Sequence, residues 1–84
     1  MAPSTKIVDM TPEQGRAARA LLDMSQTALA NAASVSLSTV VDFERSRRIV
    51  SDQAIAAIRA ALEAAGVVFL PENGNGLGVA LRKG

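Results

Sequence analysis

Apolar residues recur at helical spacing through most of the chain, and each such stretch follows a residue that can cap a helix. The run Thr11 to Gln14 (Thr-Pro-Glu-Gln) has the order of a capping box with proline in the first turn, which predicts a helix from Pro12 to about Asp23. Ser25 and Ser36 are caps of the same kind. They predict a second helix that ends near Ala33 and a third that ends near Ser46.

A fourth helix is predicted from Asp52 to about Ala65, with Ser51 as its cap and Gly66 just beyond its end. Its apolar positions follow a helical spacing: Ile55, Ile58, Leu62 and Ala65. Four short helices of this kind indicate a small, mainly α-helical bundle.

The last part of the chain changes period and predicts a β-hairpin. Apolar runs at 67–70 and 77–81 flank the polar, glycine-rich segment 71–76, and Asn73-Gly74 is typical of a two-residue hairpin turn. The pairs that such a turn forms on one face are Leu70 with Leu77 and Val68 with Val79. This face must pack on a helix or on another chain, because a lone two-stranded hairpin is marginal in water.

The 84 residues fit a single domain in three parts. Residues 1–10 are expected to form a flexible leader, residues 11–66 the helical bundle, and residues 67–84 a hairpin available for dimerisation.

The composition narrows the possible chemistry. The sequence contains no Cys, His, Trp or Tyr, which excludes zinc-finger sites, disulfide frameworks and Cys or His nucleophiles. We expect no enzyme activity and no metal or cofactor, because so short a chain places most of its residues in its core. No apolar run reaches the roughly 18–20 residues that span a bilayer, and the first ten residues lack a signal-peptide core, so we expect a cytoplasmic protein.

The formal net charge is only +1, but the charges are unevenly distributed. Residues 1–44 hold three basic and five acidic side chains, a charge of −2, whereas residues 45–84 hold six basic and three acidic side chains, a charge of +3. Three arginines, Arg45, Arg47 and Arg48, lie together and are typical of an anion-binding edge. A solvated loop is the alternative explanation of this cluster.

The segment from Ser25 to Glu44 resembles the helix-turn-helix of the Cro/CI-type (XRE-like) transcriptional regulators. Four sets of positions match: the start of the second helix, its inner face, the residues that lead into the third helix, and the inner face of the third helix. In order, these are Ser25-Gln26, Leu29-Ala30, Val35-Ser36, and Val40, Phe43 and Glu44. Ser34 stands where the family often has glycine. The resemblance covers residues 12–65 and implies a small lambda-repressor-like bundle of four helices, to which this chain adds the C-terminal hairpin.

The resemblance implies that the third helix enters the major groove of double-stranded DNA. At 100° per residue, Val40, Phe43, Glu44 and Arg47 face the bundle. The tip and the opposite face then supply the candidate base contacts: Leu37, Ser38, Val41 and Asp42. Helix starts and the following arginines supply the candidate phosphate contacts: Ser25, Gln26, Ser36, Thr39, Arg45, Arg47 and Arg48. For Val41 the alternative is a place in the bundle, and Ser25 and Ser36 act first as caps.

The resemblance also implies a structural ion pair between Arg19 and Glu44. The alternative is a surface pair between Arg19 and Asp23, four residues later on the same helix.

Together these patterns predict a bacterial, dimeric, sequence-specific DNA-binding regulator, a repressor or autoregulator that binds a palindromic operator. The alternative is a protein-interaction module, such as an antitoxin or antiactivator. Asp42 on the outward face of the third helix and the low net charge favour this alternative.

Overall fold

The computed structural model describes residues 10–72 and 74–83. In this part of the chain the elements, in order, are α1 (Pro12–Leu22), α2 (Gln26–Ala33), α3 (Leu37–Glu44), α4 (Asp52–Ala64), β1 (Val67–Leu70) and β2 (Gly78–Leu81). The two strands form an antiparallel sheet. The predicted fold class, a mainly α-helical bundle with a C-terminal hairpin, is confirmed.

The predicted helix caps are all formed. The side chains of Thr11, Ser25, Ser36 and Ser51 each accept a hydrogen bond from the backbone amide three residues later, at 3.0–3.1 Å. At α1 the capping box is complete, because the Gln14 side chain also accepts from the amide of Thr11. A cap is a local interaction, and for this reason each helix begins where the sequence predicts.

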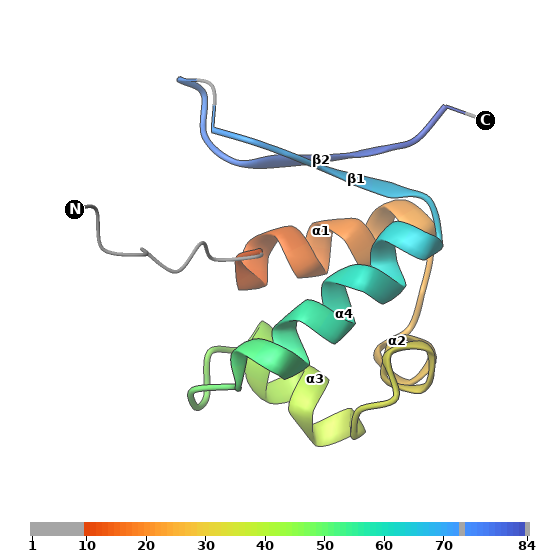
Figure 1. Ribbon diagram of the computed structural model, residues 1–84, viewed down its shortest axis with the longest axis vertical. Helices are drawn as coiled ribbons and strands as arrows, with labels where there is room; N and C mark the ends of the chain where they lie inside the picture. Colours follow the sequence, from red (N-terminus) through yellow and green to blue (C-terminus); the bar gives the residue numbers. More distant parts are fainter. Residues whose placement is uncertain (1–9, 73, 84) are drawn as a thin grey trace.

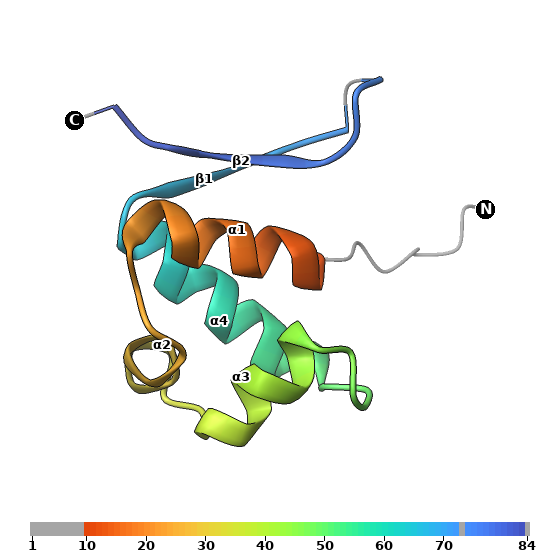
Figure 2. The same ribbon diagram turned by 180° about the vertical axis from the view of Figure 1, so that it is seen from behind.

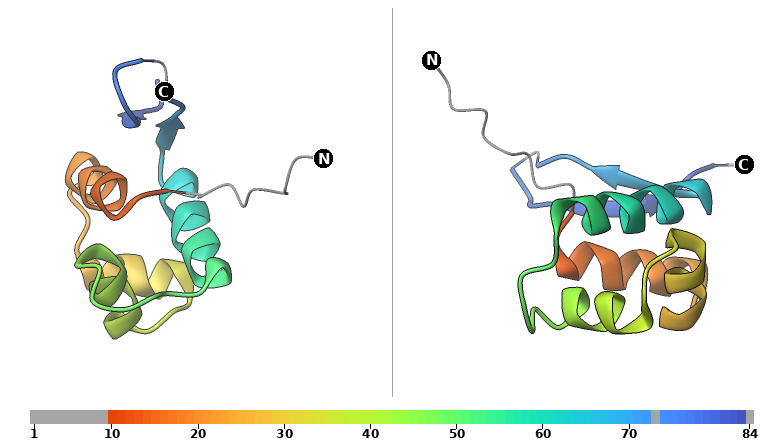
Figure 3. Two further views of the ribbon diagram at one scale, coloured as in Figure 1. Left: turned by 90° about the vertical axis from the view of Figure 1, so that its left-hand side faces the viewer. Right: turned by 60° about the horizontal axis from the view of Figure 1, so that its bottom comes forward.

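The hairpin and α3 lie at opposite ends of the molecule, which measures 40 Å along its longest axis (Figure 1). Helices α1 and α4 lie between them, and the view from behind shows the same order (Figure 2). From the side, the hairpin covers the pair α1 and α4 on one side, while α2 and α3 lie on the other (Figure 3). The molecule therefore has a helix-turn-helix end and a hairpin end.

The core lies where the helices meet. Its largest fully buried apolar side chains are Met10, Leu29, Ile58, Leu62, Val40 and Val67. Met10, assigned above to the flexible leader, is thus part of the core. It directly precedes the cap of α1, a position from which an apolar side chain packs back onto the first turns of the helix.

The hairpin has a different register from the one predicted. The observed pairs are Val67 with Leu81, Val68 with Ala80, Phe69 with Val79, and Leu70 with Gly78. The predicted pairing of Leu70 with Leu77 is wrong by one residue, and so is the shared face of Val68 and Val79, because a one-residue slip exchanges the two faces.

The connection between the strands explains this difference. It runs from residue 71 to residue 77, longer than a two-residue turn. The carboxylate of Glu72 accepts hydrogen bonds from the amides of Gly74 and Gly76, at 2.9 and 3.0 Å, and so closes a wide loop. Asn73 of the predicted turn lies outside the described residues.

Candidate DNA interface

Helices α2 and α3 are joined by a tight turn in which Ser34 is left-handed, with φ 58° and ψ 40°. The amides of Ser34 and Val35 donate to the carbonyls of Asn31 and Ala30, at 3.2 and 3.0 Å. These bonds close α2 in the way that a glycine C-cap does. The turn is therefore formed without the glycine that the family often has, at the steric cost of a Cβ in the left-handed region.

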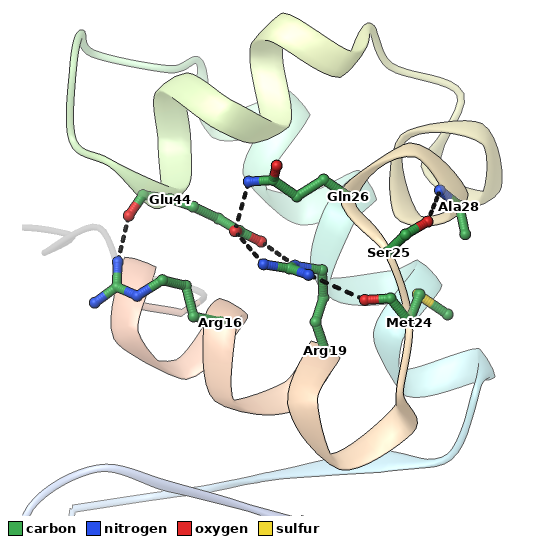
Figure 4. Close-up of polar contacts among 7 residues, drawn as sticks. All are labelled: Arg16, Arg19, Met24, Ser25, Gln26, Ala28 and Glu44. Carbon is green, nitrogen blue, oxygen red and sulfur yellow. Dashed lines mark hydrogen bonds and ion pairs between the residues drawn. The ribbon is translucent and has the colours of Figure 1, made fainter.

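The carboxylate of Glu44 joins α1, α2 and α3, and the residue is only 2% exposed (Figure 4). Arg19 of α1 donates from Nε and Nη2 to its two oxygens, at 2.7 and 2.8 Å, in a bidentate ion pair. Gln26 of α2 donates from Nε2 to the same carboxylate at 3.0 Å. Arg19 thus pairs with Glu44, and its alternative partner Asp23 is exposed.

Arg19 also holds the connection between α1 and α2, because its Nη1 donates to the carbonyl of Met24 at 3.0 Å. The hydrogen bonds to Glu44 raise the pKa of Arg19 above its ordinary value; the charge of the carboxylate adds to this effect, and burial opposes it. Arg19 is therefore charged at any physiological pH, and the pair fixes α3 on α1.

Arg16 forms a further link to α3, one that was not predicted from the sequence. It lies one turn before Arg19 on α1, and its Nη1 donates to the backbone carbonyl of Glu44 at the end of α3 (Figure 4). The spacing of the two arginines on α1 was the available signal, since residues three apart share a helix face.

Two of the candidate phosphate contacts at the start of α2 have partners inside the protein. The hydroxyl of Ser25 accepts from the amide of Ala28, and the half-buried Gln26 side chain binds Glu44. The side-chain amide of Gln26 has two N–H groups, and one of them donates to Glu44. The other N–H group is the one with which Gln26 could bind a phosphate. The backbone amides at the start of α2 complete this candidate site.

The outward face of α3 carries the candidate base contacts. Leu37 and Ser38 are exposed, whereas Val41 and Asp42 are half-buried. At the start of the helix, Ser36 Oγ lies 3.0 Å from Ser38 Oγ and 2.8 Å from Thr39 Oγ1. This face therefore offers hydroxyl groups at its tip beside an apolar surface.

Helix α3 ends at Glu44, earlier than predicted, because Ser46 is left-handed with φ 53°. The amide of Arg47 donates to the carbonyl of Asp42 at 2.9 Å, which closes the helix end. The predicted position of Arg47 on the bundle-facing side of the helix is therefore wrong, and its side chain is exposed. Arg45 and Arg48 are exposed as well, and we call residues 45–48 the basic segment.

The basic segment is tied to α3 by an ion pair. Arg48 Nε donates to Asp42 Oδ2 at 2.7 Å, so an arginine balances the carboxylate on the outward face of α3. The next residue, Ile49, is 95% exposed, although Val50 beside it is buried. No local pattern in the sequence distinguishes Ile49 from Val50, so the exposure of Ile49 could not be predicted.

Two other kinds of site are absent from residues 10–72 and 74–83. No three or more acidic, His or Cys side chains gather there in a group that could hold a metal ion. Nor does any helix in these ranges have both the length and the apolar character needed to traverse a membrane.

A helix-turn-helix family model matches residues 16–65, more than half of the chain, and the matched region contains the α2–turn–α3 unit described above. The chain belongs to the helix-turn-helix family. This helix-turn-helix protein is a DNA-binding transcription regulator of the XRE type, as the Cro/CI resemblance implied. None of the curated proteins matches it significantly in sequence.

Proposed function

We propose that this helix-turn-helix protein is a bacterial repressor or autoregulator that binds a palindromic operator as a homodimer, with α3 of each copy in the major groove. One observation carries the proposal. The basic segment continues directly from α3, and Arg48 is held against Asp42 on the outward face of that helix. The candidate phosphate contacts and the candidate base contacts are thus next to each other.

The outward face of α3 suits direct contact with bases. The hydroxyl of Ser38 can donate to or accept from base edges, and the apolar side chains of Leu37 and Val41 suit thymine methyl groups. Arg45 and Arg47 then supply charge for the phosphates on either side. With so few polar contacts on one helix, two copies on half-sites roughly 34–36 Å apart are needed for useful discrimination.

Two features favoured the alternative of a protein-interaction module: the low net charge and the carboxylate of Asp42 on the outward face of α3. The second of these no longer supports it. A carboxylate at Asp42 would repel phosphates if it were unpaired, but Arg48 balances it. We therefore propose no second function.

Selection from a library of random-sequence duplexes tests the proposal. The expected result is an enriched two-fold symmetric motif whose half-sites are about 10 bp apart, bound on the order of 10³-fold more tightly than unselected duplexes. The same motif upstream of the protein's own gene supports autoregulation. If no motif is enriched over many rounds, sequence-specific binding is ruled out.

Salt dependence tests the phosphate contacts. The logarithm of the association constant should fall linearly with the logarithm of salt concentration, with a slope near −0.9 for each phosphate contact. Arg45→Ala should weaken binding to every duplex and flatten this slope by about 1. Arg59→Gln is the matched control, because it removes a like charge from α4, beside Phe69 of the hairpin, and should leave the slope unchanged.

A further inference from the structure

The hairpin leaves apolar surface and backbone groups uncovered. Each strand has a single neighbour among residues 10–72 and 74–83, and neither strand contains a polar side chain. Val68 and Leu70 are 38% and 41% exposed, and Leu77 and Leu81 are 53% and 50% exposed. A two-stranded sheet is marginal by itself, and an open apolar edge is a template for pairing with another chain.

We propose that the outer edge of β2 pairs with β2 of a second copy of this chain, so that two hairpins form one four-stranded antiparallel sheet. The inference deepens the proposed function, on which it rests for the requirement that two copies bind one operator. It names the surface through which they assemble.

The backbone of β2 is suitably oriented for this pairing. Arg82 N–H donates to the carbonyl of Gly66 at 2.7 Å, which makes these two residues a hydrogen-bonded pair that extends the hairpin ladder. Such pairs alternate along antiparallel strands. Ala80 therefore turns its backbone groups toward β1, whereas Val79 and Leu81 turn theirs to the outer edge. Pairing of Val79 with Leu81 of the second copy places the two Ala80 residues opposite each other on the two-fold axis.

The side chains beside the two edges favour β2 over β1. Beside β1, Arg59 of α4 lies 4.8 Å from the centre of the Phe69 ring and pairs with Glu63 at 3.1 Å, and charged neighbours of this kind protect a strand edge. Beside β2 lies α1, since Gln14 donates to the carbonyl of Gly78 at 3.0 Å. Leu21, two turns after Gln14 and so on the same side of α1, is 42% exposed. On the side of α1 next to β2, neither Gln14 nor Leu21 carries a charge, in contrast to Arg59 and Glu63 beside β1.

The charges at the two ends of β2 are complementary in the proposed pair. Glu72 lies against the amide of Gly76 before the strand begins, and Arg82 and Lys83 follow directly after it. A two-fold axis perpendicular to the sheet reverses the second copy. Lys83 of each copy then lies beside Glu72 of the other, so that one such contact forms at each end of the interface.

The position of the hairpin relative to α3 selects this arrangement over face-to-face packing. The two elements lie at opposite ends of the molecule, so hairpins stacked on their outer faces would direct the two α3 helices to opposite sides (Figure 1). Edge-to-edge pairing about a perpendicular axis keeps the helical layers of both copies on one side of the sheet. Both α3 helices then face the same DNA duplex.

Cysteine cross-linking tests the pairing, since the chain contains no natural cysteine. Ala80→Cys in the full chain should form a disulfide-linked dimer under mild oxidation, because Cα atoms in a non-hydrogen-bonded pair lie about 4.5 Å apart, within the range of a disulfide. Val68→Cys is the matched control, because Val68 is opposite Ala80 in the same hairpin but would lie about 14 Å from its copy, three strand spacings away. We expect Ala80→Cys to cross-link at least tenfold faster. Equal or reversed rates overturn the proposal.

Leu81→Pro provides a second test that does not need cross-linking. It removes an N–H that points to the outer edge and leaves the bonds to β1 in place, so the helical circular dichroism should not change. The dissociation constant of the dimer, from sedimentation equilibrium, should rise at least tenfold, and an unchanged constant overturns the inference. A dimer that binds the selected duplex specifically, but in which Ala80→Cys cross-links no faster than Val68→Cys, overturns this inference alone. A β2-linked dimer without specific binding overturns only the proposed function.

Discussion

Arg48 donates to Asp42 at 2.7 Å and thereby joins the basic segment to the outward face of α3. The two side chains are 52% and 20% exposed, and exposed pairs of this kind contribute little to the free energy of unfolding. In the proposed complex with DNA we expect a larger effect, because the pair would keep a carboxylate from facing the phosphates unbalanced.

Arg48→Ala should therefore weaken DNA binding more than Arg45→Ala does. Both variants lose one positive charge, but Arg48→Ala also exposes the unpaired carboxylate of Asp42 to the phosphates. We expect an additional loss of roughly tenfold, about 1.4 kcal/mol, measured by fluorescence anisotropy at fixed salt. In the double variant Asp42→Asn/Arg48→Ala the additional loss should disappear. Equal losses in the two single arginine variants would show that Asp42 lies away from the DNA.

Loss of Arg19 should destabilise the protein more than loss of Glu44. In Arg19→Ala the carboxylate of Glu44, which is 2% exposed, is left without its cation and without access to water. We expect about 3 kcal/mol of destabilisation, the lower end of the range for a broken buried pair. In Glu44→Ala the Arg19 side chain, 21% exposed, can still reach water, so we expect about 2 kcal/mol, as for a lost hydrogen bond to a charged group.

Thermal unfolding measures this difference, since 1 kcal/mol shifts the Tm of a domain of this size by about 4–8 °C. Arg19→Met/Glu44→Leu, which removes both charges, should unfold at a higher temperature than Arg19→Ala. Arg48→Ala is the control for an exposed pair and should cost less than about 1 kcal/mol. If Glu44→Ala has the Tm of the parent chain, the Glu44 network does not stabilise the fold.

Ser34→Gly should stabilise the protein. Ser34 is left-handed with φ 58°, which costs a residue with a Cβ about 1–2 kcal/mol; the greater freedom of glycine in the unfolded chain offsets part of the gain. We expect a net gain of about 0.5–1 kcal/mol in chemical denaturation. Ser36→Ala, two residues away, should instead lose about 1 kcal/mol, because it removes the cap of α3. A lower midpoint for Ser34→Gly would contradict the left-handed turn.

Gln14→Ala should loosen the hairpin, whereas Thr11→Ala should not. Each substitution removes half of the capping box of α1, but Gln14 alone of the two also donates to the carbonyl of Gly78 in β2, at 3.0 Å. We expect the amide of Ala80 to exchange with deuterium roughly tenfold faster in Gln14→Ala than in Thr11→Ala. Similar exchange rates would mean that the hairpin is held by its apolar contacts alone.

The helix starts could be predicted because each depends on a serine or threonine and an amide three residues away. The end of α3 could not be predicted in this way. Ser46 takes the left-handed conformation that sequence patterns assign to glycine, and the bond from the amide of Arg47 to the carbonyl of Asp42 forms through the backbone, whichever side chains are present. The hairpin register was missed for a related reason, since the carboxylate of Glu72 closes a loop that the Asn73-Gly74 pattern describes as a tight turn.

The inward-facing residues of α3 could be predicted from the sequence, but the hydrogen-bond partners of Glu44 could not. The periodicity of α3 indicates that Val40 and Phe43 face inward, and both are buried. The contacts of Gln26 and Arg16 with Glu44 cross 18 and 28 residues of sequence. No spacing along one helix contains that information, because it depends on how three helices pack.

Helix α1, only 11 residues long, carries contacts to both ends of the molecule. The side chain of Gln14 donates a hydrogen bond to β2, while those of Arg16 and Arg19 donate to Glu44 at the end of α3. A displacement of this helix along its own axis would shift the strand that we propose for assembly and the helix that we propose for DNA contact in a single movement. Genetic screens for altered operator preference should therefore recover substitutions in α1, at positions that touch no nucleotide.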